Sequence, residues 1–145
     1  MSLSGYQNEG NAETFIVKGT VIGEGHMFQP DGTFAADGVT PNAVIIPVGG
    51  PVASQPIFVA TAPEGATHAV GDPVTGINIR AYTSYKVVAG AAITAPTDAA
   101  DSIMCHSDTV PGCVELDSTT TLAAVGVNRT SSAKAAGEFL TIWPL

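Results

Sequence analysis

The stretch TLAAVGVNRTSSAKAAGEFLTIWPL, residues 121–145, decides the fold class of this chain. It holds two short apolar runs, Leu122–Arg129 and Glu138–Trp143, separated by small and polar residues. This pattern predicts two adjacent strands, in which every second side chain shares a face. Pro144 cannot donate to a ladder and therefore ends the second strand. We expect the only tryptophan, Trp143, to be buried at that strand end, and the pair to form the wall against which the earlier strands pack.

Further short apolar runs precede this pair, separated by turn signals at intervals of roughly ten residues. No segment keeps a 3.6-residue period, and 16 glycines and 10 prolines suit many short strands joined by turns. The sequence therefore predicts an all-β fold: a small single-domain β-barrel or sandwich of short antiparallel strands with little helix. The expected strands are Thr14–Ile22, Ala43–Val48, Ile57–Ala62, Gly76–Tyr82, Ser84–Val88, Ser102–Cys105 and Cys113–Leu116.

The chain of 145 residues is long enough for one domain, which we place at residues 14–145. Residues 1–13 are mostly small and polar and predict an extended N-terminal arm without a core of its own. Such an arm is either a disordered terminus or a segment that orders against a partner. Tyr6 and the following Phe15 are the anchors that it could use.

The segment Gly23–Gly38 is rich in turn signals and predicts a long surface loop or a small hairpin excursion. A solvated loop has no need of its three large apolar side chains, which either pack back onto the core or meet a neighbouring molecule. The candidate contacts with a sister subunit or a partner surface are Tyr6, Phe15, Met27, Phe28 and Phe34.

One short pattern occurs twice. Gly71–Val74 and Gly137–Leu140 both read glycine, acid, any residue, aliphatic, and Gly90–Ile93 is a weaker third copy. In each case we expect a glycine-led turn that delivers the chain into a strand. The echo is either chance or the trace of a repeated small β-unit, and the sequence leaves both open.

The charge balance excludes some partners. Net charge is −8 with five basic residues, which argues against nucleic acid and against an anionic membrane surface. No apolar run approaches the ~18 residues of a membrane-spanning helix. The first residues lack the basic start and apolar core of a secretory leader, so we expect a product made in a cytoplasm. Charged residues make up only 12%, which favours a surface partly covered by neighbouring subunits.

The sequence offers no chemistry-bearing motif. It lacks a nucleophile elbow, a Walker loop and a dinucleotide fingerprint, and its three histidines, His26, His68 and His106, have no metal-ligand spacing. Cys105 and Cys113 flank a Pro-Gly turn that could bring the thiols together, but cytoplasmic origin favours two reduced core thiols. We therefore predict no catalytic, cofactor-binding or metal-binding residue.

The C-terminal half contains a succession of small-residue steps that is similar to a known family. Its pieces are Gly90–Thr94, Ile103–Cys105, Val114–Leu116, Ala124–Val127 and Ala136–Ile142. In this order they resemble the capsid decoration, or cement, proteins of tailed bacteriophages: a strand after an Ala-Gly step, a hairpin, an Ala-x-Gly-Val strand, a Ser/Ala-rich turn and a closing strand. The long Gly23–Gly38 segment and the two cysteines depart from that pattern.

The resemblance implies an all-β domain that binds the major capsid protein as a homotrimer on the outer face of the head. It also implies an N-terminal arm that reaches onto the shell, a virion location, assembly in the host cytoplasm and no enzymatic activity. Two alternatives remain. The first is a recognition module for glycans or adhesion, or another structural component of a virion, and a glycan-binding module needs a platform of exposed aromatic side chains. A trimeric all-β enzyme such as a dUTP pyrophosphatase needs a Gly-x-Ile-Asp-x-x-Tyr run, which is absent.

Overall fold

The predicted all-β class with a small barrel and little helix is confirmed by the computed structural model of the chain. Its described residues fall into two compact units, the first built from residues before 46 and from 53–82, the second from 46–52 and 83–145. The single helical element among them is a 3₁₀ turn, η1 (Ala100–Ser102). The structure describes residues 12–52, 55–61, 66–81, 83–98, 100–116 and 124–145.

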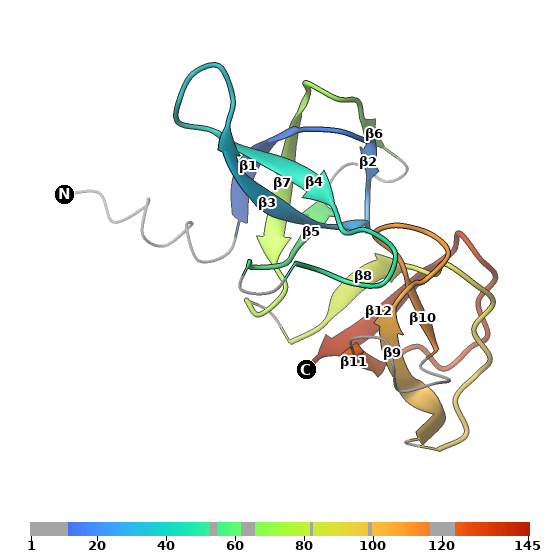
Figure 1. Cartoon of the computed structure of the whole chain (residues 1–145). Coiled ribbons are helices and arrows are strands. Elements are labelled where there is room, and N and C mark those ends of the chain that lie inside the picture. Colours follow the sequence, from blue (N-terminus) through green and yellow to red (C-terminus); the bar gives the residue numbers. More distant parts are fainter. Residues whose placement is uncertain (1–11, 53–54, 62–65, 82, 99, 117–123) are drawn as a thin grey trace. The chain divides into compact units, whose positions relative to one another are not determined.

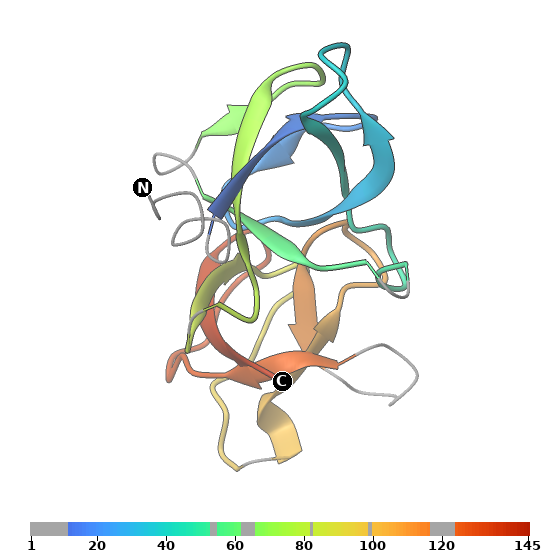
Figure 2. The ribbon, with the colours of Figure 1, turned by 90° about the vertical axis from the view of Figure 1, so that its left-hand side faces the viewer.

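The first unit is a closed barrel (Figures 1 and 2). Its five strands follow each other round the barrel in the order β1-β4-β3-β5-β7, and β2 and β6 form a separate two-stranded ladder. The neighbouring strands are antiparallel, as predicted, except β1 and β4, which run parallel. The strands are β1 (Ala12–Val17), β2 (Ile22–Gly23), β3 (Met27–Phe34), β4 (Pro41–Ile45), β5 (Phe58–Thr61), β6 (Thr67–His68) and β7 (Pro73–Asn78).

Three phenylalanine rings fill the barrel. Phe15 meets Phe28 and Phe58 edge to face, with ring centroids 5.1 and 4.8 Å apart. Phe28 and Phe58 stack at 5.9 Å. Gly76 on β7 makes room for them, because a Cβ atom there would overlap the Phe28 ring and lie 3.0 Å from Cβ of Phe58. The strand alternation of β1 thus points Phe15 into an aromatic core.

The second unit contains the predicted C-terminal pair. Its five-stranded sheet has the order β10-β9-β11-β12-β8. A parallel bridge between Ala89, just after β8, and Val114 on β10 brings the two outer strands together. The strands are β8 (Tyr85–Val88), β9 (Ile103–His106), β10 (Val114–Leu116), β11 (Ala124–Asn128) and β12 (Phe139–Pro144).

The C-terminal pair, β11 and β12, is antiparallel as predicted and lies in the middle of its sheet. It is not a wall for every earlier strand, since β1 to β7 pair only with one another. Leu140 and Ile142 are buried, whereas Trp143 is 46% exposed, so the expected burial of the tryptophan is wrong. The period of two forces this outcome, because it places Trp143 on the face opposite to Leu140 and Ile142.

The Gly23–Gly38 segment is not a surface loop. It contains β3, which lies between β4 and β5 in the barrel. The turn-forming residues Pro30 and Gly32 are accommodated within the strand, where the register with β4 shifts between Pro30 and Phe34. Conversely, the expected strand Thr14–Ile22 is interrupted after Val17, and Gly19 adopts a positive φ of 85°.

Candidate interaction surfaces

The predicted contact residues separate into two classes. Phe15, Met27 and Phe28 are buried, so these three belong to the interior and offer no surface to a partner. Strand formation explains the correction, since a residue that reads as exposed in a loop can point inward once its segment joins a sheet. Phe34 is 58% exposed and remains available. Tyr6 lies outside the described residues.

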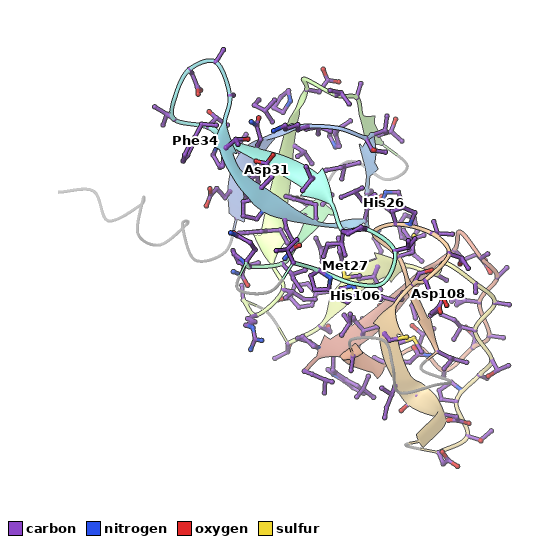
Figure 3. The ribbon with its side chains drawn as sticks, viewed as in Figure 1. His26, Met27, Asp31, Phe34, His106 and Asp108 are labelled. Carbon is purple, nitrogen blue, oxygen red and sulfur yellow. The ribbon has the colours of Figure 1, made fainter. Side chains whose placement is uncertain are left out.

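Phe34 belongs to the far end of the β3–β4 hairpin, which extends from the barrel (Figures 1 and 3). We call residues 34–39 the hairpin tip. Its second large apolar side chain, Val39, is 77% exposed and was missed from the sequence, where one valine among turn residues gives no signal. Inside the tip, Ala35 N–H donates to the Thr40 carbonyl at 2.8 Å, and Gly38 N–H donates to the Ala35 carbonyl at 2.9 Å. The tip is therefore a hydrogen-bonded turn with two apolar side chains directed to solvent.

Asp37 fixes the conformation of this tip. Its Oδ1 accepts hydrogen bonds from the N–H groups of Val39 at 2.9 Å and Thr40 at 2.8 Å. Thr40 Oγ1 donates to Oδ2 at 2.5 Å. The bond from the Thr40 hydroxyl and those from the two N–H groups lower the pKa of Asp37, because each of them favours the charged carboxylate. The tip thus combines a negative charge with apolar surface.

Asp31 ties the hairpin to the segment after β1. Lys18 Nζ donates to Asp31 Oδ2 at 2.7 Å, and the Thr33 N–H donates to Oδ1 at 2.8 Å. Partial burial alone would raise the pKa of Asp31, but the bonds from Lys18 and Thr33 outweigh it and lower the pKa to about 2. An exposed ion pair adds little stability. Its effect here is to orient the hairpin on the barrel.

A second surface lies on the outward face of β8, β12 and β11. Lys86 Nζ stands 4.6 Å from the centroid of the Phe139 ring. Arg129 Cζ stands 5.8 Å from the centroid of the Trp143 ring. We call these four residues the aromatic face. Of the five basic residues in the chain, two lie here, each over a ring in cation–π geometry. Rings flanked by cations suit a partner that offers both apolar groups and carboxylates.

Sequence reasoning missed this face, although part of the signal was present. The alternation of strand side chains places Phe139, Thr141 and Trp143 on one side of their strand. The error lay in taking the only tryptophan for a core residue. Indole rings are often only partly buried, because their N–H group needs a partner.

The two cysteines are free and buried, which confirms the expectation of reduced core thiols. The predicted hairpin around Pro111 and Gly112 also forms, with β9 and β10 paired antiparallel. Burial raises the pKa of Cys113 to about 11, so this thiol stays protonated at neutral pH. Cys113 therefore acts as a small apolar group, whereas Cys105 Sγ donates to the Glu115 carbonyl at 3.5 Å.

Three polar residues belong to the β9–β10 hairpin of the second unit: His106 at the end of β9, Ser107 in the loop that follows, and Glu115 on β10 (Figure 3 labels His106 and Asp108). Ser107 Oγ accepts from the N–H groups of Thr109 at 3.1 Å and Val110 at 3.0 Å, and it donates to Glu115 Oε2 at 2.9 Å. These bonds use the hydroxyl to hold the loop, which is a structural role.

His106 is one source of pH dependence in the described structure. It is 2% exposed, and burial lowers the pKa of its imidazole to about 4. Its Nδ1 has no hydrogen-bond partner among the described residues. The neutral ring is thus favoured by desolvation.

We expect the free energy of unfolding to fall as pH drops from 6.5 to 4. In this pH window the unfolded chain binds a proton at His106 and the folded chain does not. The contribution of His106 to the free energy of unfolding is therefore complete only at pH values above the pKa that this residue has in the unfolded chain. The variant His106→Gln should flatten this part of the curve. Urea unfolding followed by circular dichroism at pH 7 and pH 4.5 measures the difference. A variant with an unchanged pH slope would assign the effect to another group, such as His26, whose pKa burial also lowers.

Metal and membrane chemistry find no support in the described ranges. Among the residues that the structure describes, no group of three or more His, Cys, Asp or Glu side chains could hold a metal ion. In the same part of the chain, no helix has the length and apolar character needed to cross a membrane.

No protein-family model, curated protein or solved structure matches this chain.

Proposed function

We propose that this chain is a capsid decoration protein of a tailed bacteriophage, which binds the outer surface of the head as a homotrimer and stabilises it. The observation that carries the proposal is the hairpin tip: Phe34 and Val39 expose apolar surface on a turn that Asp37 holds in one conformation. Exposed apolar side chains on a hydrogen-bonded scaffold suit binding, because little conformational freedom is lost when they are covered.

The resemblance to decoration proteins supports the same proposal from the sequence. Four of its five pieces fall on consecutive elements of the second unit, namely β9, β10, β11, and the turn after Asn128 with β12. The first piece, Gly90–Thr94, forms no strand and contributes a single bridge between Ile93 and Lys134. The net charge of −8 fits a protein partner better than nucleic acid.

The proposed mechanism is mechanical. Each trimer contacts several subunits of the major capsid protein at once, and the contacts reinforce one another through their high effective concentration. Separation of neighbouring shell subunits then requires several contacts to break together. A decorated head consequently resists internal pressure that an undecorated head does not. The product is made in the host cytoplasm and ends on the outer capsid surface.

The variant Phe34→Ser/Val39→Ser should reduce attachment to heads from which the protein has been removed by at least tenfold. Two exposed apolar side chains lose their contacts, whereas folding is unaffected because both already face water. The control is Val21→Ser/Val70→Ser, which removes two exposed valines elsewhere in the same unit. Co-sedimentation with emptied heads of a candidate phage, together with solution mass, measures attachment and assembly.

Two results would contradict this proposal. One is a strictly monomeric protein that fails to sediment with the heads of every phage tested. The other is attachment that falls equally in the control variant, which would mean that general surface hydrophobicity, and not the tip, accounts for binding.

A recognition module is the second candidate, and one observation favours it. Trp143 presents 46% of its surface, with Arg129 beside it, as a glycan-binding platform requires. If this candidate is correct, the protein binds defined sugars on a glycan array and the variant Trp143→Ala loses that binding while it keeps its attachment to heads. An array without hits removes the candidate.

A further inference from the structure

We infer that the chain is an internal duplication: the second unit is another copy of the five-stranded β-unit that forms the first. The strand orders agree element by element. Round the first unit the order is β1-β4-β3-β5-β7, and round the second it is β8-β10-β9-β11-β12. In both, the first strand runs antiparallel to the last and parallel to the second strand of the central hairpin.

The registers agree as well, which is a stricter test, because a slip of one residue turns every side chain of a strand to the other face. The first and last strands pair Phe15 with Val74 in one unit and Val87 with Leu140 in the other. This makes Phe15 equivalent to Val87, and Val74 equivalent to Leu140. Continuing along the last strand, Ile77 is equivalent to Trp143.

The equivalence can be followed round both units from partner to partner. At each strand pair, the residue that pairs in the first unit and the residue that pairs in the second unit are again equivalent. The last strand pair leads back to Val17 and Ala89, which the comparison of β1 with β8 had already made equivalent. Five strand pairs therefore agree in register at these positions, and the two irregularities, between Pro30 and Phe34 and between Ala124 and Gly126, lie beyond them. The successive pairs are Ile77–Val59 and Trp143–Val127, Val59–Met27 and Val127–Ile103, Pro30–Ala43 and His106–Val114, and finally Ala43–Val17 and Val114–Ala89.

The turn before the last strand is also repeated, bond for bond. In the first unit Gly71 N–H donates to the Val17 carbonyl at 2.8 Å, and the Val17 N–H donates to the Asp72 carbonyl at 2.9 Å. In the second unit Gly137 and Ala89 make the same bond at 2.8 Å, and the Ala89 N–H donates to the Glu138 carbonyl at 2.9 Å.

The acidic side chain of each turn accepts a hydrogen bond from the N–H group of the alanine three residues before it. Asp72 Oδ2 accepts from Ala69 N–H at 3.2 Å, and Glu138 Oε1 accepts from Ala135 N–H at 2.6 Å. Both glycines have a positive φ, 93° and 89°. The Gly-acid echo of the sequence is therefore a shared structural element. The weaker sequence echo at Gly90 is not part of this shared element. Gly90 follows Ala89 and is therefore equivalent to the residue after Val17, not to the glycine of the turn.

The two cores fill equivalent positions with different volumes. The first unit has Phe28 and Phe58 around Gly76. At the equivalent positions the second unit has Met104 and Gly126 around Ile142, which is fully buried. The small residue is Gly76 in the first copy and Gly126, at the position of Phe58, in the second, so a larger residue at one position accompanies a smaller residue at another. This compensation explains why the duplication leaves only a four-residue trace in the sequence.

The copies differ most on the surfaces described above. The hairpin runs through residues 31–42 in the first copy and through the shorter 107–113 in the second, so the tip with Phe34 belongs to the first copy alone. The aromatic face belongs to the second copy alone. Its residues Lys86, Arg129 and Trp143 stand where the first copy has Thr14, Thr61 and Ile77.

The test is a transplant of one core into the other. The variant Gly76→Ile alone should unfold the first unit, because its side chain overlaps Phe28 and Phe58. Adding Phe28→Met and Phe58→Gly introduces the residues that the second unit has at these three positions and should restore a cooperative transition and slow amide exchange in β3, β5 and β7. Thermal unfolding with hydrogen exchange by mass spectrometry separates the two units.

A second experiment exchanges the two turns, and its variants are expected to stay folded. The variants Val70→Ala/Asp72→Glu and Ala136→Val/Glu138→Asp swap the two turns and should leave the midpoint within about 2 °C. Gly71→Ala and Gly137→Ala are the controls, and each should lower the midpoint by several degrees. The duplication is overturned if the triple core variant is no more stable than Gly76→Ile, or if the exchanged turns cost as much as the glycine controls. Neither readout involves a phage head, so the result is independent of the proposed function.

Discussion

The variant Phe15→Ala is expected to lower the free energy of unfolding of the first unit by about 3–5 kcal/mol, the range for large-to-small changes of a buried phenylalanine. Phe15 is 1% exposed and makes edge-to-face contacts with both Phe28 and Phe58, so its removal leaves the other rings facing a cavity. The barrel is closed and can collapse only partly around that space. Part of the loss is the aromatic pairing itself, which is worth about 0.5–1.5 kcal/mol beyond burial.

Phe34→Ala is the matched control for this experiment, since it removes the same atoms from an exposed site in the same unit. We expect it to change stability by less than about 0.5 kcal/mol. Urea unfolding monitored by far-UV circular dichroism measures both variants. If the two were equally destabilised, Phe15 would not occupy a packed core and the barrel described here would be incorrect.

The variant Gly126→Ala should destabilise the second unit by an amount near the upper end of the ~1–3 kcal/mol observed for overpacked cores. A Cβ atom at Gly126 would overlap the carbonyl oxygen of Trp143 and come within 3.2 Å of the Cα atom of Pro144. These are backbone atoms of the neighbouring strand, which cannot move away as a flexible side chain can. The ladder between β11 and β12 would have to open.

Gly23→Ala is the comparison, because a Cβ atom there would meet only ordinary contacts, the nearest at 3.4 Å from the His26 ring. Hydrogen exchange should show faster exchange in β11 and β12 for Gly126→Ala and no change there for Gly23→Ala. Equal protection of β11 in both variants would mean that the two strands do not approach as closely as described.

Much of the fold could be predicted because short apolar runs and turn signals act locally. The β9–β10 hairpin and the β11–β12 pair follow from their own residues and turns. The strand β3 could not be predicted in this way. Pro30, Gly32 and the Asp37–Gly38 step all signal turns, and only the hydrogen bonds that β4 and β5 offer on either side make an extended strand the better solution.

The candidate surfaces were predictable only in part. Phe34 was identified because a large apolar side chain among turn residues is unusual. Met27 and Phe28 met the same criterion but are both buried, Phe28 within the barrel core, and this depends on the register that β3 adopts with its neighbours. The pairing of Lys86 with Phe139 and of Arg129 with Trp143 joins residues from separate strands, and no local pattern could reveal it.

The repetition of one β-unit within a single chain has a consequence for how this protein can change over time. Because each copy has its own core, the exterior of one copy can be reshaped without any change in the core residues of the other. The lengthened hairpin and the aromatic face are then independent acquisitions on a common frame. A chain built in this way can vary one binding surface to follow a changing partner while the other surface keeps its affinity.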